Sequence, residues 1–354
     1  MNKSIFIGSL KAAFAIIGAV IGAGFITGRE IMKFFFGNNQ PVLFCILLVA
    51  FTVFVYVTLA NKNPVIESVM QKSNFIINIL CVLTVASMLG ATDSLARDLK
   101  MSGELPVFSV LMLIFSVFIC IGGIEKLTKF NLILVPVMLI VLFAIIGGGL
   151  IFSDNKDIGF SRSFDFLSPL SYSCMNVMLT QPLLISIKKE EKTFSPLLTS
   201  LITAFALALS AALYLTVLPK ECLMSDIPIL YLVSNTKWAY YLVASMIAAG
   251  IVTTLVGSLY PLLHVIEGKL HVLWVIMVCL LSFLVSRLGF YVIVDKIYPL
   301  LSLIAVIYYI VIFCVLPLVF RIKARQRTLK PQVRTKERYS SLQGQVSAPV
   351  RHIL

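Results

Sequence analysis

The sequence is poor in ionisable side chains. Of its 354 residues only 13% are charged and three are histidine, whereas 59% are hydrophobic, and the mean hydropathy is +1.00. Soluble globular domains carry about 25% charged residues. This shortage of charge excludes a soluble protein and indicates a chain that lies in a membrane.

The residues that disulfide scaffolds and enzymes need are also scarce or unsuitably placed. Six of the seven cysteines lie within apolar segments, so they indicate no disulfide framework. The sequence has no phosphate loop of the G-x-x-x-x-G-K type, no buried His/Cys cluster and no Ser/His/Asp set at one depth. We therefore expect no enzyme activity and no cofactor.

Long apolar segments, by contrast, recur along the whole chain. Segments of about 18 or more mostly apolar residues are typical of transmembrane helices, and the alternating pattern of a membrane barrel is missing. The sequence therefore predicts an all-α polytopic membrane protein with ten transmembrane helices. The predicted spans are 6–35, 41–60, 74–96, 106–123, 130–152, 166–187, 196–217, 237–263, 270–286 and 290–320.

The basic C-terminal segment 321–354 sets the expected orientation. It carries nine Lys and Arg against the single acid Glu337, in a chain of net charge +13. Because basic segments stay in the cytoplasm, we expect both termini to be cytoplasmic in a multi-pass protein of the cell membrane. The tail is predicted to be disordered and shows no folded basic module, so no nucleic-acid partner is expected.

The longest polar interruption divides the spans into two halves. The segment 153–165 is predicted to be an extracellular loop between a first five-helix repeat, 1–152, and a second, 166–320. An odd number of spans per half turns the second half over, as in the inverted repeats of many secondary transporters. A short sequence similarity between VASMLGA (85–91) and VASMIAA (243–249) supports such a duplication.

The first span contains a dense glycine cluster in the stretch IGAVIGAGFITGRE (17–30). Gly18, Gly22, Gly24 and Gly28 fall within eleven residues where an unbroken helix is otherwise expected. Glycine weakens a helix, so the helix is predicted to open there. The alternative is close packing, because the spacing of these residues also fits the small-xxx-small pattern of membrane helix pairs.

The sixth span carries a surplus of polar residues at the position that matches this cluster. The stretch LSPLSYSCMNVMLTQP (167–182) contains two prolines and several hydroxyl and amide side chains. Interrupted apolar segments at matching positions of two halves indicate a transporter site. We therefore predict that helices 1 and 6 are both discontinuous and that their exposed peptide groups bind the solute.

The motif IGAVIGAGF, together with ten spans in two halves of five, resembles the amino acid–polyamine–organocation (APC) superfamily, which has the LeuT fold. Over about residues 5–320 the chain is most similar to bacterial YkvI-like membrane proteins. The resemblance implies a LeuT-like 5+5 inverted repeat with the substrate at the breaks in helices 1 and 6. The implied substrate-binding residues are Gly22, Ala23, Gly24, Phe25, Ser171, Tyr172, Ser173 and Asn176.

The resemblance also implies a sodium site between the first and eighth spans. Sodium prefers oxygen ligands, and three carbonyls with two hydroxyls would supply five neutral ones. The implied ligands are Gly18, Ile21, Gly250, Thr253 and Thr254. The alternative is that the two threonines bond back to the backbone of their own helix.

These features predict a secondary transporter that imports a small zwitterionic solute, such as an amino acid or a derivative, with sodium by alternating access. The expected lack of charged side chains deep in the spans argues against a strongly charged substrate. A permease-like receptor that binds without transport, as in spore germinant receptors, and a channel remain alternatives.

Arg29 and Asp295 are candidates for an extracellular gate pair or for solvated interface charges, and Asp93, Arg97 and Asp98 are expected to cap the third span.

Overall fold

The structure, a computed structural model, describes eight ranges of the chain. They are residues 3–35, 74–101, 106–152, 167–190, 195–217, 225–264, 270–315 and 318. The predicted span 41–60, the loop 153–165 and the tail 321–354 lie outside the described residues. The chain divides into two units, Met1–Val306 and Ile307–Leu354, and the contacts discussed below lie within the first.

The described residues form helices joined by short turns, and no strand occurs in these ranges. Each predicted span that falls within them coincides with one helix or with a series of short helices. The elements are α1 (Lys3–Val20), α2 (Ala23–Ile26), α3 (Arg29–Phe34), α6 (Asn74–Asp98), α7 (Val107–Ile121), α8 (Gly123–Phe152), α9 (Leu167–Glu190), α10 (Pro196–Val217), α11 (Pro228–Leu232), α12 (Lys237–Leu263), α13 (His271–Ser286), α14 (Phe290–Val292), η2 (Ile293–Ile297), α15 (Tyr298–Ile310) and η3 (Val311–Val315).

Several of these helices have the length and composition of membrane spans. Five are long and apolar enough to cross a membrane: Lys3–Val20, Phe75–Asp98, Gly123–Ile145, Lys237–Leu263 and Phe290–Val315. Shorter apolar helices cover Val107–Ile121, Leu197–Leu207 and His271–Ser286. Large apolar side chains such as Phe75, Phe118 and Phe205 are at least 70% exposed, as expected for surfaces that face lipid. The chain is therefore a helical membrane protein with several spans.

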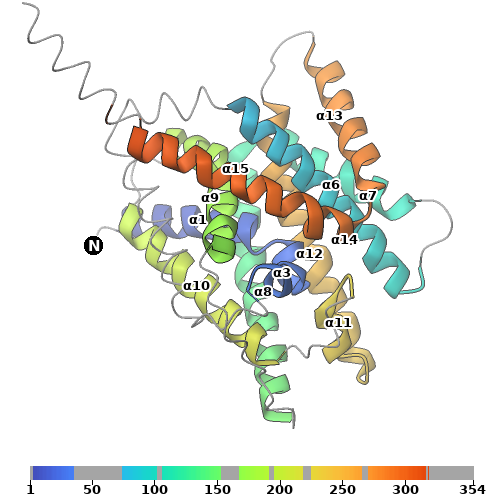
Figure 1. The fold of residues 1–354 in the computed structure, drawn as a ribbon. Helices are drawn as coiled ribbons and strands as arrows, with labels where there is room; N and C mark the ends of the chain where they lie inside the picture. The colour runs from blue at the N-terminus through green and yellow to red at the C-terminus, as the bar shows by residue number, and fades with distance from the viewer. Residues whose placement is uncertain are drawn as a thin grey trace, which may run out of the picture. The chain divides into compact units, whose positions relative to one another are not determined.

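Helix α12 is the central helix of the first unit. It packs against α1, α6, α7 and α8 and contacts the short α2, and most of its residues are buried (Figure 1). Small residues permit this packing: a Cβ added at Gly257 would lie 3.6 Å from the Cβ of Ala19 on α1. The first two helices of the first span, α1 and α2, thus lie directly against α12.

The first span is interrupted near its middle. Helix α1 ends at Val20, where the Ile21 N–H donates to the Ile17 carbonyl at 2.6 Å, and regular bonding resumes when the Ile26 N–H donates to the Gly22 carbonyl at 2.9 Å. A second turn separates α2 from α3 at Gly28, whose φ of 82° lies in the left-handed region that favours glycine. The glycine cluster therefore breaks the helix, as the sequence predicts.

The prediction of a discontinuous sixth span is wrong. Helix α9 runs without interruption from Leu167 to Glu190, with Pro182 inside it. Pro169 lies in the first turn, where the missing N–H of a proline costs no helical hydrogen bond. Four hydroxyl and amide side chains of this span bond to carbonyls of their own helix, so they give no reason for the backbone to open; they are Ser171, Ser173, Asn176 and Thr180.

Candidate functional site

The interruption of the first span lies against the middle of α12, at Thr254. The Thr254 hydroxyl donates to the Gly18 carbonyl at 3.5 Å, and a Cβ added at Gly22 would lie 1.8 Å from Thr254 Oγ1. Only glycine at residue 22 leaves room for the Thr254 side chain at this distance. Of the five predicted sodium ligands, the structure thus brings Gly18 and Thr254 together.

The distance of 3.5 Å between these two oxygens is long for a hydrogen bond, whose usual O···O distance is about 2.7–2.8 Å. Thr253 behaves differently, because its hydroxyl donates to the Gly250 carbonyl of its own helix at 2.9 Å. The local-bonding alternative therefore holds for Thr253 but not for Thr254.

A buried amide on α8 faces the same part of the first span. Asn131 is completely buried, and neither its Oδ1 nor its Nδ2 has a hydrogen-bond partner in the described residues. A Cβ added at Gly18 would lie 3.3 Å from Cγ and Nδ2 of this amide. Because buried amides are normally bonded, this one marks a polar position beside Gly18 that a water molecule or an ion could satisfy.

A carboxyl group lies on the other side of the interruption. Oε1 of Glu30, a residue of α3, lies 1.9 Å from the position of a Cβ at Gly24, so the carboxyl packs directly on this glycine. Its Oε2 accepts a hydrogen bond of 2.8 Å from the Tyr172 hydroxyl of α9. Glu30 is 6% exposed, and Tyr172 is buried between Phe34 and Phe35. The first and sixth spans therefore meet through a carboxyl group and a phenol.

The other predicted substrate residues of α9 direct their polar groups into their own helix. The hydroxyls of Ser171 and Ser173 donate to the carbonyls of Ser168 and Pro169, and the Asn176 amide donates to the Tyr172 carbonyl. On the first span, Phe25 is buried. Ala23 begins α2 beside Gly22 and Gly24. Of the eight predicted substrate residues, Gly24 and Tyr172 are thus linked through Glu30.

The predicted pair of Arg29 and Asp295 forms an ion pair. The Arg29 Nη2 atom lies 2.7 Å from Asp295 Oδ1, and the two side chains are 4% and 18% exposed. Asp295 lies in the π-helical turn η2, and such turns often occur at functional sites. Arg29 also donates to the Ser225 carbonyl and stacks on Tyr291. Of the two alternatives that the sequence leaves open for these residues, the structure shows an ion pair that is largely buried rather than two solvated charges.

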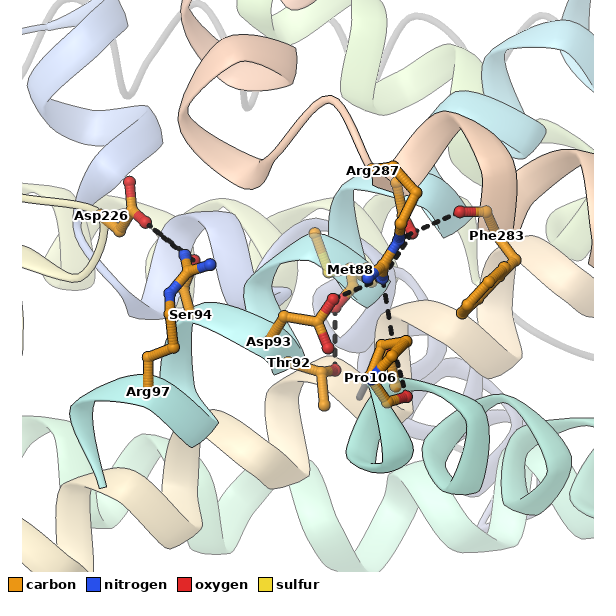
Figure 2. A network of polar contacts seen from close by, with 11 residues as sticks. Met88, Thr92, Asp93, Ser94, Arg97, Pro106, Asp226, Phe283 and Arg287 are labelled. Carbon is orange, nitrogen blue, oxygen red and sulfur yellow. Dashed lines mark hydrogen bonds and ion pairs between the residues drawn. The ribbon is translucent and has the colours of Figure 1, made fainter. Parts of the chain in front are cut away.

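Two further ion pairs fix the C-terminal end of α6. Figure 2 shows Arg97 and Ser94 directed toward Asp226 on one side and Asp93 directed toward Arg287 on the other. The distances to Asp226 Oδ2 are 3.3 Å from Arg97 Nη2 and 2.8 Å from Ser94 Oγ. Asp226 lies just before α11, and Arg287 follows α13. Asp93 and Arg97 thus join α6 to its neighbours, whereas the sequence predicts only a helix cap for them.

Glu30 is the residue that the sequence analysis missed. The expectation of no charged side chain deep in the spans is wrong for this residue, because it is buried and contacts both Gly24 and Tyr172. Its position within the predicted span 6–35 is the available signal, since ionisable residues inside membrane segments usually have a function.

Comparisons with known proteins agree with the membrane assignment and leave the function open. The sequence matches no protein-family profile. It is 24% identical over 336 residues to the uncharacterized membrane protein YkvI of Bacillus subtilis (strain 168), covering 86% of this chain and 95% of that protein. It is also 23% identical over 314 residues to the uncharacterized protein YyaD of the same organism, covering 82% and 92%. The similarity therefore extends over nearly the full length of both relatives.

Proposed function

We propose that the chain is a secondary active transporter of a small zwitterionic solute, such as an amino acid or a derivative, and that it works by alternating access with sodium as the coupling ion. The observation that carries the proposal is the interruption of the first span at Ile21 and Gly22, in contact with Thr254 of α12. Broken helices at membrane depth are tolerated where backbone groups line a binding site.

The ten-span arrangement in two inverted halves, with cytoplasmic termini, is part of this proposal. Its support is the coincidence of described helices with predicted spans and the contacts of the first span with α9 and α12. The outer half of the first span is held by Arg29 and Asp295, and the Thr27 carbonyl accepts a hydrogen bond of 3.1 Å from the Ile229 N–H of α11. These contacts support a state in which the path from the outer end of the first span to the break is closed.

The coupling ion is assigned from the chemistry of the oxygens near the break. The Gly18 carbonyl and the Thr254 hydroxyl are neutral oxygens from two different helices, and the amide of Asn131, whose Nδ2 lies nearest to Gly18, is a third neutral polar group beside them. Neutral oxygens suit a monovalent cation, because a small number of dipoles can balance a single charge. The proposal assigns no enzymatic step and no cofactor to the chain.

Uptake into proteoliposomes tests this proposal. Radiolabelled amino acids are offered with an inward sodium gradient and, separately, with potassium in its place. We expect sodium-dependent accumulation that is lost in Gly24→Leu, because a side chain at residue 24 would collide with Glu30. The matched control is Gly148→Leu on α8, since a Cβ there meets nothing within 4 Å.

Two results would contradict parts of the proposal. Uptake that is unchanged in potassium would refute sodium coupling but not transport. Saturable binding of a solute without any flux, in wild-type protein that is correctly inserted, would instead favour a receptor.

A further inference from the structure

We propose that Glu30 is the recognition group for the substrate and that its carboxylate binds a protonated amine of the solute at the break in the first span. This inference rests on the proposed function and names the chemical class of the substrate more narrowly. It differs from the sequence-based expectation, in which peptide groups alone hold the solute.

Glu30 has no cationic side chain of the described residues to balance its charge. Its carboxyl group accepts one hydrogen bond, from Tyr172, and forms no ion pair with a cationic side chain in the described residues. Its neighbour Arg29 is not available, because that guanidinium pairs with Asp295. A buried carboxylate without a cation costs several kcal/mol, so either a proton or a bound cation has to neutralise it.

The carboxyl group of Glu30 packs on the backbone of the first span, close to the break. Oε1 lies where a side chain at Gly24 would begin, between the two short helices that follow the break. A glutamine of the same shape would fill this space without the cost of burying a charge. The acid is therefore best explained by a ligand that needs it, as is usual for ionisable residues inside membrane segments.

The surroundings of Glu30 favour an organic ammonium over a divalent metal ion. Ca²⁺ and Mg²⁺ take about six or more oxygen ligands, carboxylates among them, and the described residues contain no group of three His, Cys, Asp or Glu side chains. Beside the carboxyl group lies the ring of Tyr172, which packs 4.9 Å from Phe34 and 5.4 Å from Phe35. A carboxylate next to aromatic rings suits a protonated amine attached to an apolar body.

The test is a thermal-shift screen of the purified full-length protein in detergent. The probes are the protein amino acids, the amines formed from them by decarboxylation, and the N-acetyl derivatives of both sets. We expect stabilisation only by compounds with a free amine, and loss of the effect on N-acetylation. Glu30→Gln should weaken the affinity of every such compound by about tenfold or more, since a charge-assisted bond becomes a neutral one.

Controls separate recognition from folding. Glu125→Gln makes the same chemical change at an exposed acid on α8, where the side chain is 64% exposed, and should bind like the wild type. Tyr172→Phe removes the hydroxyl donor to Glu30 but keeps the carboxylate, so the affinity is expected to change while the selectivity for free amines over N-acetyl derivatives persists. If Glu30→Gln proves unstable, Glu30→Asp keeps the charge on a shorter side chain and should retain amine selectivity with reduced affinity.

Three outcomes would overturn the inference: stabilisation by N-acetylated compounds equal to that by their amines, undiminished amine binding in Glu30→Gln, or no amine-dependent shift in the wild type. The second outcome would mean that Glu30 carries only a proton. Sodium-driven uptake of a solute without an amine would refute this inference and the proposed substrate class, while leaving sodium-coupled transport itself intact.

Discussion

A methyl group at residue 22 tests the geometry on which the proposed mechanism depends. In Gly22→Ala the new Cβ would lie 1.8 Å from Thr254 Oγ1, 2.9 Å from its Cβ and 3.0 Å from its Cγ2. Carbon atoms in favourable contact are about 3.5–4.0 Å apart, so rotation of the hydroxyl alone cannot relieve the overlap. Threonine is stiff at χ1 and this one is buried in α12, so the two helices have to move apart.

The expected loss of stability follows from the known effect of adding a methyl group to a well-packed core. Inserting one methyl group into a tightly packed contact destabilises by about 1–3 kcal/mol. We therefore expect Gly22→Ala to lower the apparent melting temperature in detergent by several degrees and to abolish stabilisation by sodium, because Thr254 Oγ1 is displaced. The measurement is thermal unfolding followed by fluorescence in sodium and in potassium buffers.

A matched substitution on the same helix pair serves as the control. A Cβ at Gly257 of α12 would meet Ala19 at 3.6 Å, an ordinary contact, and alanine improves helix propensity by about 1 kcal/mol. Gly257→Ala should therefore be at least as stable as the wild type. If Gly22→Ala is equally stable and keeps its response to sodium, the first span does not meet Thr254 as described and the cation proposal loses its basis.

Three further predictions concern the polar contacts around the break. Arg29→Ala should destabilise the protein by about 3–5 kcal/mol in chemical unfolding, because it leaves the partly buried Asp295 without its cation, and an effect below 1 kcal/mol would show that the pair is solvated. Thr254→Val should remove stabilisation by sodium in thermal-shift titrations, whereas Thr253→Val should largely keep it, and equal loss in both variants would argue for two hydroxyl ligands. Asn131→Leu should raise the melting temperature measured without sodium, because it removes an unsatisfied buried amide, and should reduce the rise in melting temperature that sodium causes. A lower melting temperature both with and without sodium would indicate that the amide has a purely structural role.

The apolar spans could be predicted from the sequence because their signal is long and local. Helices α6 and α12 coincide with the predicted segments 74–96 and 237–263 to within two residues. The break in the first span could also be predicted, since several glycines close together weaken a helix wherever it lies. The ten-span count and the 5+5 symmetry remain predictions.

The details of the site depend on contacts between distant segments, and the sequence predicted them less well. The polar residues of the sixth span suggested an open helix, but side chains such as Ser173 and Asn176 bond to carbonyls one turn earlier, which composition does not reveal. Glu30 follows Arg29 and looks like another interface charge. Its burial becomes visible only when Tyr172, 142 positions later, is placed against it.

Arg29 and Glu30 are consecutive residues with partners on different spans. Side chains next to each other on a helix point roughly 100° apart, and here one is anchored to Asp295 of η2 while the other is anchored to Tyr172 of α9. Two consecutive residues of α3 therefore connect η2 with α9. A rotation of α3 that breaks one of these contacts also changes the other, so ligand binding at the Glu30 carboxyl group and the ion pair of Arg29 with Asp295 are expected to change together.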